Sequence, residues 1–423
     1  MYKIETLPNN LRIITREEST RESTSIGFWV GVGGRYECDR LKGAAHFLEH
    51  IVFKGSQEYA CEEIKQSIEG VGGSLNAFTS EEQTCFYAKV PAKHLNSTFD
   101  VLADMVFFPK ITKKDVQSEK TVIVEEIKMY HDLPQYHVME LLDGLLFPGH
   151  PLGKSLAGSA QTVLAMTHKD LKEFHSHYYH TDNIVISVCG NVSHDKIVRL
   201  IKKKLSKLQS TQGQPLQLFD EAQKKPRTHY EHRAIEQMHV ALGMPAYDEN
   251  DPKRYVMGLI NVILGANMSS RLFVEVREKR GLAYSISSSP KSLHDVGSFM
   301  VRAGVDSTKI VDAVSVILKE LNKLTKALVP EDEFRRAKDY LLGQLLLGLE
   351  DTMDHMLWIG EGMISNNTLK TRKKVVAAFK KITRKDIKDI AQEIFNAKKY
   401  NLAVIGPVTK KQTKELNDLM GVK

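Results

Sequence analysis

The 423-residue sequence predicts an α+β fold with two homologous α/β sandwich domains, each a sheet with helices packed against it. Two observations lead to this prediction. Strand patterns and longer helical patterns are mixed in both halves of the chain, without the strict alternation of a parallel α/β fold. In addition, one series of motifs occurs twice in the same order, which indicates an internal duplication.

The internal repeat rests on three pairs of motifs. Thr167–Glu173 (THKDLKE) recurs in the second half of the chain as Thr383–Asp389 (TRKDIKD). The apolar strand that follows each copy ends in a glycine at the same separation, and Thr112–Lys120 parallels Pro330–Lys338 at nearly that separation. The alternative is two unrelated α/β domains that share a helix-capping pattern, since T-x-K-D is a common start of a helix.

The repeat predicts an N-terminal domain over residues 1–208 and a C-terminal domain over residues 229–423. The segment between them, 209–228, is polar, rich in glutamine and carries two prolines, which is typical of a linker. The chain begins with a predicted strand, a turn at Pro8-Asn9-Asn10 and a second strand. Further strands are expected at Ser25–Val32, Gln83–Val90, Asn183–Val192, His239–Met244, Gly297–Val305 and Tyr400–Ile405.

Composition excludes several classes of protein. The longest apolar runs, 183–192 and 340–350, are much shorter than the roughly 20 residues that cross a bilayer, so we expect no membrane association. The net charge of +7 is spread over amphipathic helical patterns, which argues against nucleic acid as a partner. The N-terminus lacks a secretory signal pattern and the four cysteines lack C-x-x-C spacing, so we expect a cytoplasmic protein with reduced thiols.

The segment His46-Phe-Leu-Glu49-His50 contains the pattern H-x-x-E-H. On a helix, His46 and His50 lie one turn apart on the same face, a spacing that suits two imidazole nitrogens on one zinc ion. Glu49 lies beside them, where it can take a proton from an activated water. The alternative is a pair of surface histidines, but the neighbouring apolar residues indicate a buried helix, in which unligated histidines are costly.

A third zinc ligand is expected on the helix that begins near Thr112. Glu119, Glu126 and Tyr130 share one face of that helix, whereas Glu125 points about 100° away from Glu126. Glu126 is therefore the preferred ligand. Glu119 either orients a ligating histidine from outside or moves toward the metal. Acidic residues are common in helices, so this pair by itself is a weaker signal than H-x-x-E-H.

With these residues the chain resembles the inverzincin peptidases of the pitrilysin and mitochondrial-processing-peptidase family. That family carries H-x-x-E-H and a glutamate ligand at a fixed distance after the second histidine. The separation of His50 and Glu126 equals that distance, and Glu119 matches the family's additional glutamate. The resemblance runs from about Ile4 to the end of the chain and includes Gly43–His50, Phe53–Gly55, Gly72–Thr79 and Val122–Lys128. It implies two duplicated domains that form half of a clamshell and bind one zinc ion per chain.

The second repeat lacks H-x-x-E-H, and Gln344 stands where the counterpart of Glu126 is expected, so this half should bind no zinc. From residue types alone, Arg277 and Tyr284 are a surface charge and a strand residue. The family resemblance instead assigns them to a catalytic pair that stabilises the tetrahedral oxyanion. It also implies a homodimer in which one chain completes the other's site, with a heterodimer containing a degenerate partner as the alternative.

The expected function is that of a zinc-dependent endopeptidase that cleaves unfolded peptides or extended protein segments, with Glu49 as general base. The resemblance suggests that substrate adds as a β-strand along Leu75, Asn76, Ala77, Phe78 and Thr79. Two alternatives remain open at this point. They are a non-catalytic structural or regulatory subunit of the same family, and a peptide-binding module that needs no metal.

Overall fold

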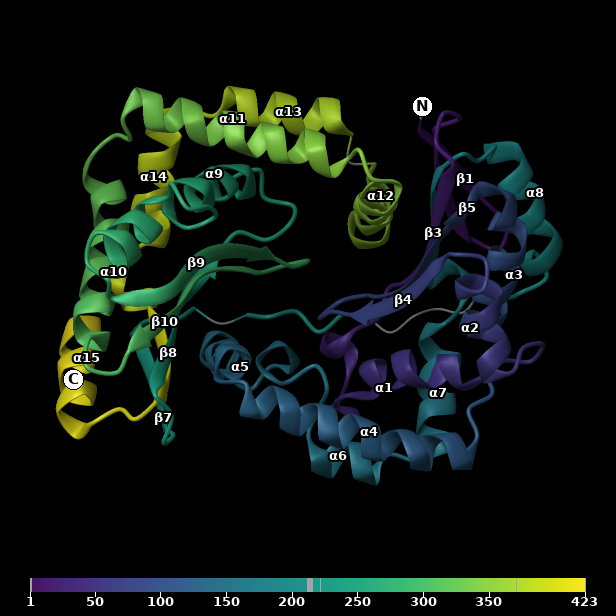
Figure 1. Ribbon diagram of the computed structural model, residues 1–423, viewed down its shortest axis with the longest axis horizontal. Helices are drawn as coiled ribbons and strands as arrows, with labels where there is room; N and C mark the ends of the chain where they lie inside the picture. Colours follow the sequence, from purple (N-terminus) through teal and green to yellow (C-terminus); the bar gives the residue numbers. More distant parts are fainter. Residues whose placement is uncertain (1, 211–215, 221, 370, 423) are drawn as a thin grey trace. The chain divides into compact units, whose positions relative to one another are not determined.

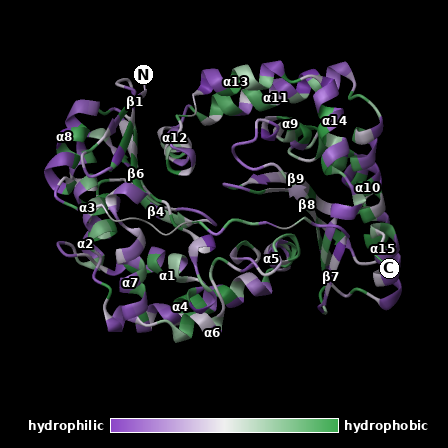
Figure 2. Cartoon of the chain, turned by 180° about the vertical axis from the view of Figure 1, so that it is seen from behind, coloured by the Kyte–Doolittle hydropathy of each residue, from purple (hydrophilic) through white to green (hydrophobic). Residues whose placement is uncertain are grey.

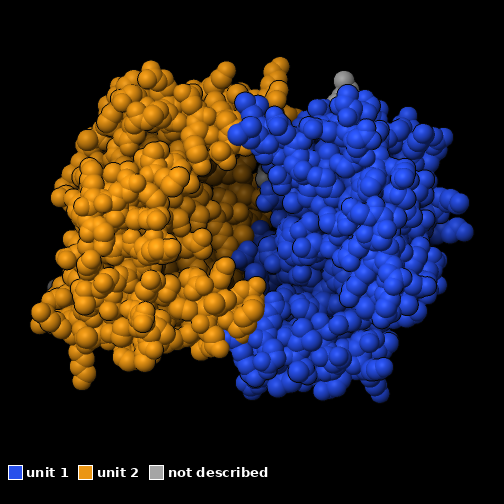
Figure 3. All heavy atoms as spheres, viewed as in Figure 1, with its two compact units in different colours: residues 1–128, 155–217, 346–370 blue, residues 129–154, 218–345, 371–423 orange. Residues whose placement is uncertain are grey.

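The computed structural model describes residues 2–210, 216–220, 222–369 and 371–422 (Figure 1). Residues 211–215 and 221 of the predicted linker therefore lie outside the described residues. The chain forms two compact units, coloured separately in Figure 3. Unit 1 comprises residues 1–128, 155–217 and 346–370, and unit 2 comprises 129–154, 218–345 and 371–423.

The sheet of unit 1 has six strands in the order β1-β2-β6-β3-β5-β4. β2 and β6 run parallel, and every other pair in this sheet is antiparallel. The predicted N-terminal hairpin is confirmed, as are the three strands expected in the first half. The strands are β1 Tyr2–Thr6, β2 Arg12–Glu17, β3 Ser23–Val30, β4 Ser74–Thr79, β5 Thr84–Pro91 and β6 Ile184–Gly190.

The sheet of unit 2 repeats this topology with five strands in the order β7-β11-β8-β10-β9. Its first pair, β7-β11, is parallel and the others are antiparallel, so it matches β2-β6-β3-β5-β4 in both order and direction. The internal duplication and the two-domain α/β fold are thereby confirmed. The strands are β7 Arg227–His232, β8 Gln237–Ala246, β9 Ala283–Ser292, β10 Gly297–Asp306 and β11 Asn401–Gly406.

The helices of both repeats begin with the same capping chemistry. In α7 the side chain of Thr167 accepts from the backbone of Asp170, which bonds back, and Thr383 and Asp386 do the same in α14. Helices of unit 1 are α1 Ala44–Ile51, α2 Cys61–Glu69, α3 Leu95–Phe107, α4 Lys113–Asp132 (whose last residues, 129–132, belong to unit 2), α6 Ala160–Ala165, α7 His168–Tyr178 and α8 His194–Leu205. Helices of unit 2 are α9 Arg254–Leu264, α10 Ile310–Lys326, α11 Glu331–Gly348, α13 Arg372–Lys381, α14 Arg384–Ile394 and α15 Lys410–Met420.

Two further helices are exchanged between the repeats. α5 (Pro134–Leu146) follows the first repeat in sequence but packs on β8 and β11 of unit 2, and α12 (Thr352–Asn366) packs on β3 and β6 of unit 1. The domains predicted from sequence, 1–208 and 229–423, are contiguous, whereas the compact units are not. Residues 129–154 belong to unit 2 and residues 346–370 belong to unit 1. Each exchanged helix covers the second face of a sheet, and that face would otherwise expose apolar side chains to water.

The main core of unit 1 lies between its sheet and its own helices, and α12 closes the opposite face around Trp29, Ile359 and Met363. Helices on the outside, such as α8 and α14, carry hydrophilic and hydrophobic residues on different faces (Figure 2). Among the described residues, no helix combines the length and the apolar character required to cross a membrane. The structure thus agrees with the amphipathic patterns of the sequence.

Glycines make room for the exchanged helices at equivalent positions of the two sheets. A Cβ atom on Gly27 in β3 would lie 2.5 Å from Met356 Sδ of α12, and one on Gly243 in β8 would lie 2.9 Å from Leu142 of α5. The separation of these two glycines in the sequence is the same as that of the repeated motifs. Close approach of helix and sheet is therefore a shared feature of both units.

Substituting Gly360 by alanine is expected to destabilise unit 1. A Cβ atom on Gly360 of α12 would lie 2.0 Å from Trp29 Nε1, whose N–H donates to Ser187 Oγ at 2.9 Å. Overpacking of this kind costs about 1–3 kcal/mol in free energy of unfolding. Gly343→Ala in α11 is the control, since its Cβ meets nothing within 4 Å, and a gain of about 0.5–1 kcal/mol is expected. Equal denaturant midpoints for the two variants would contradict this packing.

Candidate metal centre

Helix α1 is held at its start by a buried carboxylate. The Glu37 side chain accepts hydrogen bonds from the backbone N–H of Gly43 at 2.9 Å and of Ala45 at 2.7 Å, which satisfies two free donors of the first turn. Burial raises the pKa of Glu37 to about 7, although Lys42, 3.3 Å away, and the two amides oppose this shift. Sequence reasoning missed Glu37, because it precedes the helix by several residues and forms no short-range capping pattern.

The structure brings the three predicted ligands together. The rings of His46 and His50 lie 4.7 Å apart on α1, and Glu126 reaches them from α4. Glu126 Oε2 is 3.7 Å from His46 Nε2 and 3.3 Å from His50 Nε2. The preference for Glu126 over Glu125 agrees with this geometry, because Glu125 is exposed and pairs with Lys128 at 2.7 Å.

Glu119 lies on the outer side of His50. Its Oε1 accepts from, or shares a proton with, His50 Nδ1 at 2.9 Å, and its second oxygen forms an ion pair with Lys54. Although burial raises the pKa of Glu119, the bonds to His50 and Lys54 lower it below the ordinary value. Of the two roles that the sequence left open, this geometry supports an orienting contact, which directs His50 Nε2 toward Glu126.

The donor set fits a zinc ion. Tetrahedral zinc with bonds of about 2.0–2.1 Å places its donors about 3.3 Å apart, close to the two separations found between Glu126 and the histidines. Burial and the nearby His50 lower the pKa of His46 to about 4, so His46 is neutral at pH 7 as a ligand must be. Against the effect of burial, hydrogen bonds to Glu119 and Glu126 raise the pKa of His50 to about 9.

Glu49 lies on the same helix as the histidines and contacts the end of β4. The hydroxyl of Thr79 donates to Glu49 Oε2 at 2.6 Å. Burial raises the pKa of Glu49, and the bond from Thr79 partly opposes this shift. A carboxylate with a raised pKa next to the ligands is suited to accepting a proton at neutral pH.

The predicted substrate strand is β4, which forms one edge of the sheet of unit 1 and has β5 as its single partner among the described strands. Ser74 and Asn76 are exposed, and the other residues of β4 are half-buried. Phe78 anchors the strand by packing edge-on against Trp29 at 5.7 Å. An edge strand offers unpaired backbone groups, to which an extended peptide can bind.

Arg277 and Tyr284 come together in unit 2. Arg277 lies in a π-helical turn, Phe273–Glu278, and its guanidinium is 4.7 Å from the ring of Phe273 and 5.7 Å from the ring of Tyr284. Tyr284, near the start of β9, is 75% exposed. The guanidinium of Arg277 and the phenol of Tyr284 therefore both lie at the surface of unit 2. Gln344 is exposed on α11.

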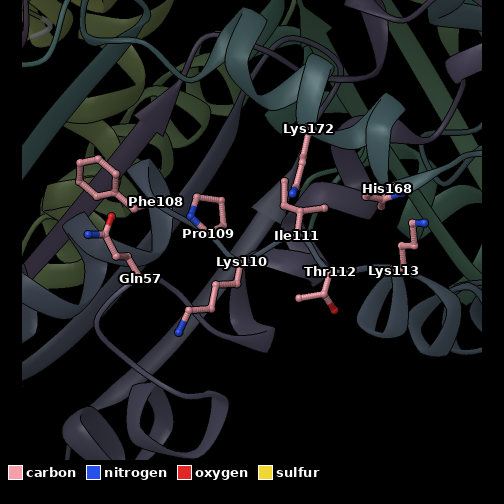
Figure 4. Close-up of a pocket in the computed structure, with 9 residues that line it drawn as sticks. All are labelled: Gln57, Phe108, Pro109, Lys110, Ile111, Thr112, Lys113, His168 and Lys172. Atoms are coloured by element: carbon pink, nitrogen blue, oxygen red, sulfur yellow. The ribbon is translucent and has the colours of Figure 1, made fainter.

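A surface pocket of about 620 Å³ lies apart from these residues, beside the first residues of α4 and α7 (Figure 4). Exposed basic side chains, among them Lys110, Lys113 and Lys172, line it. The start of each neighbouring helix is already capped by a threonine hydroxyl, Thr112 Oγ1 in α4 and Thr167 Oγ1 in α7, which accepts from the backbone N–H three residues later. None of the predicted catalytic residues lines this pocket.

Comparison with known proteins identifies the family. Residues 12–160 match the family model described as Insulinase (Peptidase family M16), and residues 165–341 match the one described as Peptidase M16 inactive domain. A Streptomyces coelicolor protein named an uncharacterized zinc protease is 36% identical over 98% of this chain and 91% of its own length. The chain belongs to the M16 peptidase family. The family resemblance of the sequence motifs is thereby confirmed.

Further proteins are similar over nearly the whole chain. The Bacillus subtilis protein named uncharacterized zinc protease YmxG is 34% identical over 96% of this chain and 98% of its own length. A crystal structure of a protease from Helicobacter pylori superimposes with a TM-score of 0.91 at 23% identity, covering 96% of this chain and 99% of that one. A Pseudomonas fluorescens structure described as a peptidase M16 inactive domain gives 0.88 at 19% identity, covering 96% and 98%. These structures confirm the M16 fold.

Replacing Glu119 by glutamine is expected to weaken zinc binding by about 10- to 100-fold. The neutral amide orients the His50 ring less firmly than the carboxylate, and loss of the negative charge makes the imidazole of His50 less basic. Glu125→Gln is the control, since Glu125 lies on the same helix but is exposed and pairs with Lys128. Titration against a chromophoric chelator measures both affinities. Equal zinc affinity in the two variants would remove Glu119 from the site.

Proposed function

We propose that this chain is a zinc-dependent endopeptidase that hydrolyses peptide bonds in unfolded peptides or extended protein segments. The convergence of His46, His50 and Glu126, with Glu49 beside them, carries the proposal. The similar M16 proteins carry the name zinc protease, and these names support the proposal. One zinc ion per chain follows, because only the first repeat carries the motif H-x-x-E-H.

Each residue of the centre has a distinct task. His46, His50 and Glu126 hold the ion, and Glu119 keeps the ring of His50 oriented. Bound zinc supplies Lewis-acid activation of a water molecule and of the scissile carbonyl. Glu49 removes a proton from the attacking water and delivers it to the leaving amine. The hydroxyl of Thr79 fixes the orientation of the Glu49 carboxylate.

Substrate binds along the free edge of β4, in this proposal, and extends the sheet of unit 1 by one strand. Main-chain pairing selects extended backbone and tolerates many side chains, which explains a preference for unfolded segments. Thr79 connects the two parts of the site, since its backbone belongs to β4 and its hydroxyl contacts Glu49. A peptide on β4 is thereby aligned with the general base.

Arg277 and Tyr284 complete the site as oxyanion donors supplied by a second chain in a homodimer. Their exposure as an adjacent pair on unit 2 supports this role. A heterodimer with a degenerate partner is the alternative assembly. We also propose a cytoplasmic location, which suits the four free cysteines Cys38, Cys61, Cys85 and Cys189.

Cleavage of an internally quenched, unstructured peptide by purified protein tests this function. The proposal expects cleavage that a chelator abolishes and that added Zn²⁺ restores. Absence of cleavage by zinc-loaded protein would favour a structural subunit. Binding of the same peptide with no cleavage, unchanged by the chelator, would favour a metal-independent binding module.

A further inference from the structure

A second group of metal-ligand side chains lies entirely within unit 2. His131 comes from the last turn of α4, His137 from the first turn of α5, and Glu231 from β7. One ligand atom of each lies within 4.8 Å of the other two. Only Leu133 separates the two helices, so the group sits at a sharp bend of the chain. Neither the H-x-x-E-H motif nor the proposed peptidase mechanism uses these residues.

This second group repeats the donor pattern of the first metal centre. His137 Nε2 is 3.1 Å from Glu231 Oε2 and its Nδ1 is 3.1 Å from Glu140 Oε2, as His50 lies between Glu126 and Glu119. The ring of His131 lies 4.6 Å from that of His137, compared with 4.7 Å between His46 and His50. The group therefore supplies two imidazoles, one inner carboxylate and one outer carboxylate that orients a histidine. Zinc sites commonly use this arrangement.

Electrostatics at His137 also resembles that at His50. The hydrogen bond with Glu140 raises the pKa of His137, and Glu231 adds to the shift. Two carboxylates around one imidazole thus favour a positive charge between His137 and Glu231. A divalent ion satisfies the same preference and adds a bond to His131.

The neighbouring Arg233 contacts two of the three members of this group, His131 and Glu231. Its Nε pairs with Glu231 Oε1 at 2.6 Å, whereas the other oxygen, Oε2, faces His137. Its Nη2 lies 3.0 Å from His131 Nε2 and 3.3 Å from Nδ1. The guanidinium therefore fixes the Glu231 carboxylate, while its positive charge limits the affinity for a cation. A site with weaker binding than the peptidase centre is expected for this reason.

A third group, Glu18, Cys189 and His355, lacks these properties. Both oxygens of Glu18 are paired with arginines, Oε1 with Arg16 at 3.1 Å and Oε2 with Arg21 at 3.3 Å. Burial raises the pKa of the Cys189 thiol to about 12, which opposes formation of the thiolate that binds a metal. Of these two groups, His131, His137 and Glu231 in unit 2 are therefore the better candidate for a metal site.

We propose that His131, His137 and Glu231 form a second zinc-binding site, separate from the peptidase centre, that joins the end of α4 to the start of α5 and to β7. The bound ion replaces a proton shared by His137 and Glu231. Its effect is structural, because it links three elements where the chain passes between the two repeats. The prediction from sequence of one zinc ion per chain then describes the peptidase centre alone.

Zinc content after equilibrium dialysis against buffered Zn²⁺ tests this site. Intact protein should hold two equivalents at a free zinc concentration that saturates it, and His131→Asn, His137→Asn and Glu231→Gln should each hold one. A His46→Asn, His50→Asn double variant should also hold one, and adding His137→Asn to it should leave none. His232→Asn is the matched control, since His232 is exposed on the opposite face of β7, and it should retain two.

Peptide cleavage separates this inference from the proposed function. His131→Asn is expected to keep cleavage activity while losing one equivalent of zinc, and retained cleavage shows that the variant is folded. If the intact protein holds a single equivalent, and the histidine variants of α1 remove it, the second site does not exist. The proposal of a second site would also be overturned if His131→Asn, His137→Asn and Glu231→Gln each retained two equivalents of zinc. Neither result would affect the assignment of the peptidase centre.

Discussion

Glu49→Gln protein is expected to lose peptide cleavage by about 10²–10⁴-fold in kcat/KM while it retains zinc, because an amide cannot accept the proton of the attacking water. The substitution preserves the size of the side chain, and the amide oxygen can still accept the hydrogen bond from Thr79. Steady-state cleavage of a quenched peptide, together with metal analysis of the same sample, measures both effects.

Glu125→Gln provides the reference for this experiment. Glu125 is exposed on α4 next to Glu126 and pairs with Lys128, so its substitution should leave both cleavage and zinc content unchanged. Cleavage by Glu49→Gln at the rate of the unmodified protein would exclude Glu49 as the general base. Loss of zinc together with activity would instead show that Glu49 acts on the metal site.

Tyr284→Phe is expected to lower kcat by about 10²–10³-fold, which is the usual cost of removing one donor to a developing oxyanion. The phenol is exposed beside Arg277 and is available to a substrate, and phenylalanine keeps the ring that contacts the guanidinium. Zinc content should not change, because Tyr284 belongs neither to the peptidase centre in unit 1 nor to the group His131, His137 and Glu231 in unit 2. An unaltered kcat would show that Tyr284 takes no part in the reaction.

Mixing two inactive variants tests whether chains share the site. In a dimer of one Glu49→Gln chain and one Tyr284→Phe chain, one composite site keeps both Glu49 and Tyr284, so cleavage should return. A Glu49→Gln chain mixed with a chain carrying both substitutions contains no intact site and should remain inactive. Absence of rescue between labelled chains that demonstrably exchange would contradict sharing across the dimer.

The sequence predicted those parts of the molecule that local periodicity encodes. His46 and His50 follow from helical spacing, and Glu126 follows from its place on the core-facing side of α4, away from Glu125. The constant separation of the repeated motifs predicted the duplicated sheets, because homologous strands keep their order along the chain. The matching caps of α7 and α14 belong to the same signal.

Features that depend on contacts distant in sequence were not predicted. The exchange of α5 and α12 depends on which of the two sheets each helix covers. The hydrophobic pattern of an amphipathic helix shows that one face is buried, but it does not indicate which sheet buries that face. Glu37 caps α1 through a bend of the chain, and Lys54 reaches Glu119 from another element. His137 and Glu231 lie in different halves of the chain, and no spacing rule connects them.

Crystals of zinc-replete protein, measured at the zinc absorption edge, test the central claim most directly. An anomalous difference map should show a peak bounded by His46 Nε2, His50 Nε2 and Glu126 Oε2, about 2.0–2.2 Å from each atom. No peak at this position in protein that cleaves peptide, or a Glu126 carboxylate turned away from both histidines, would contradict the account.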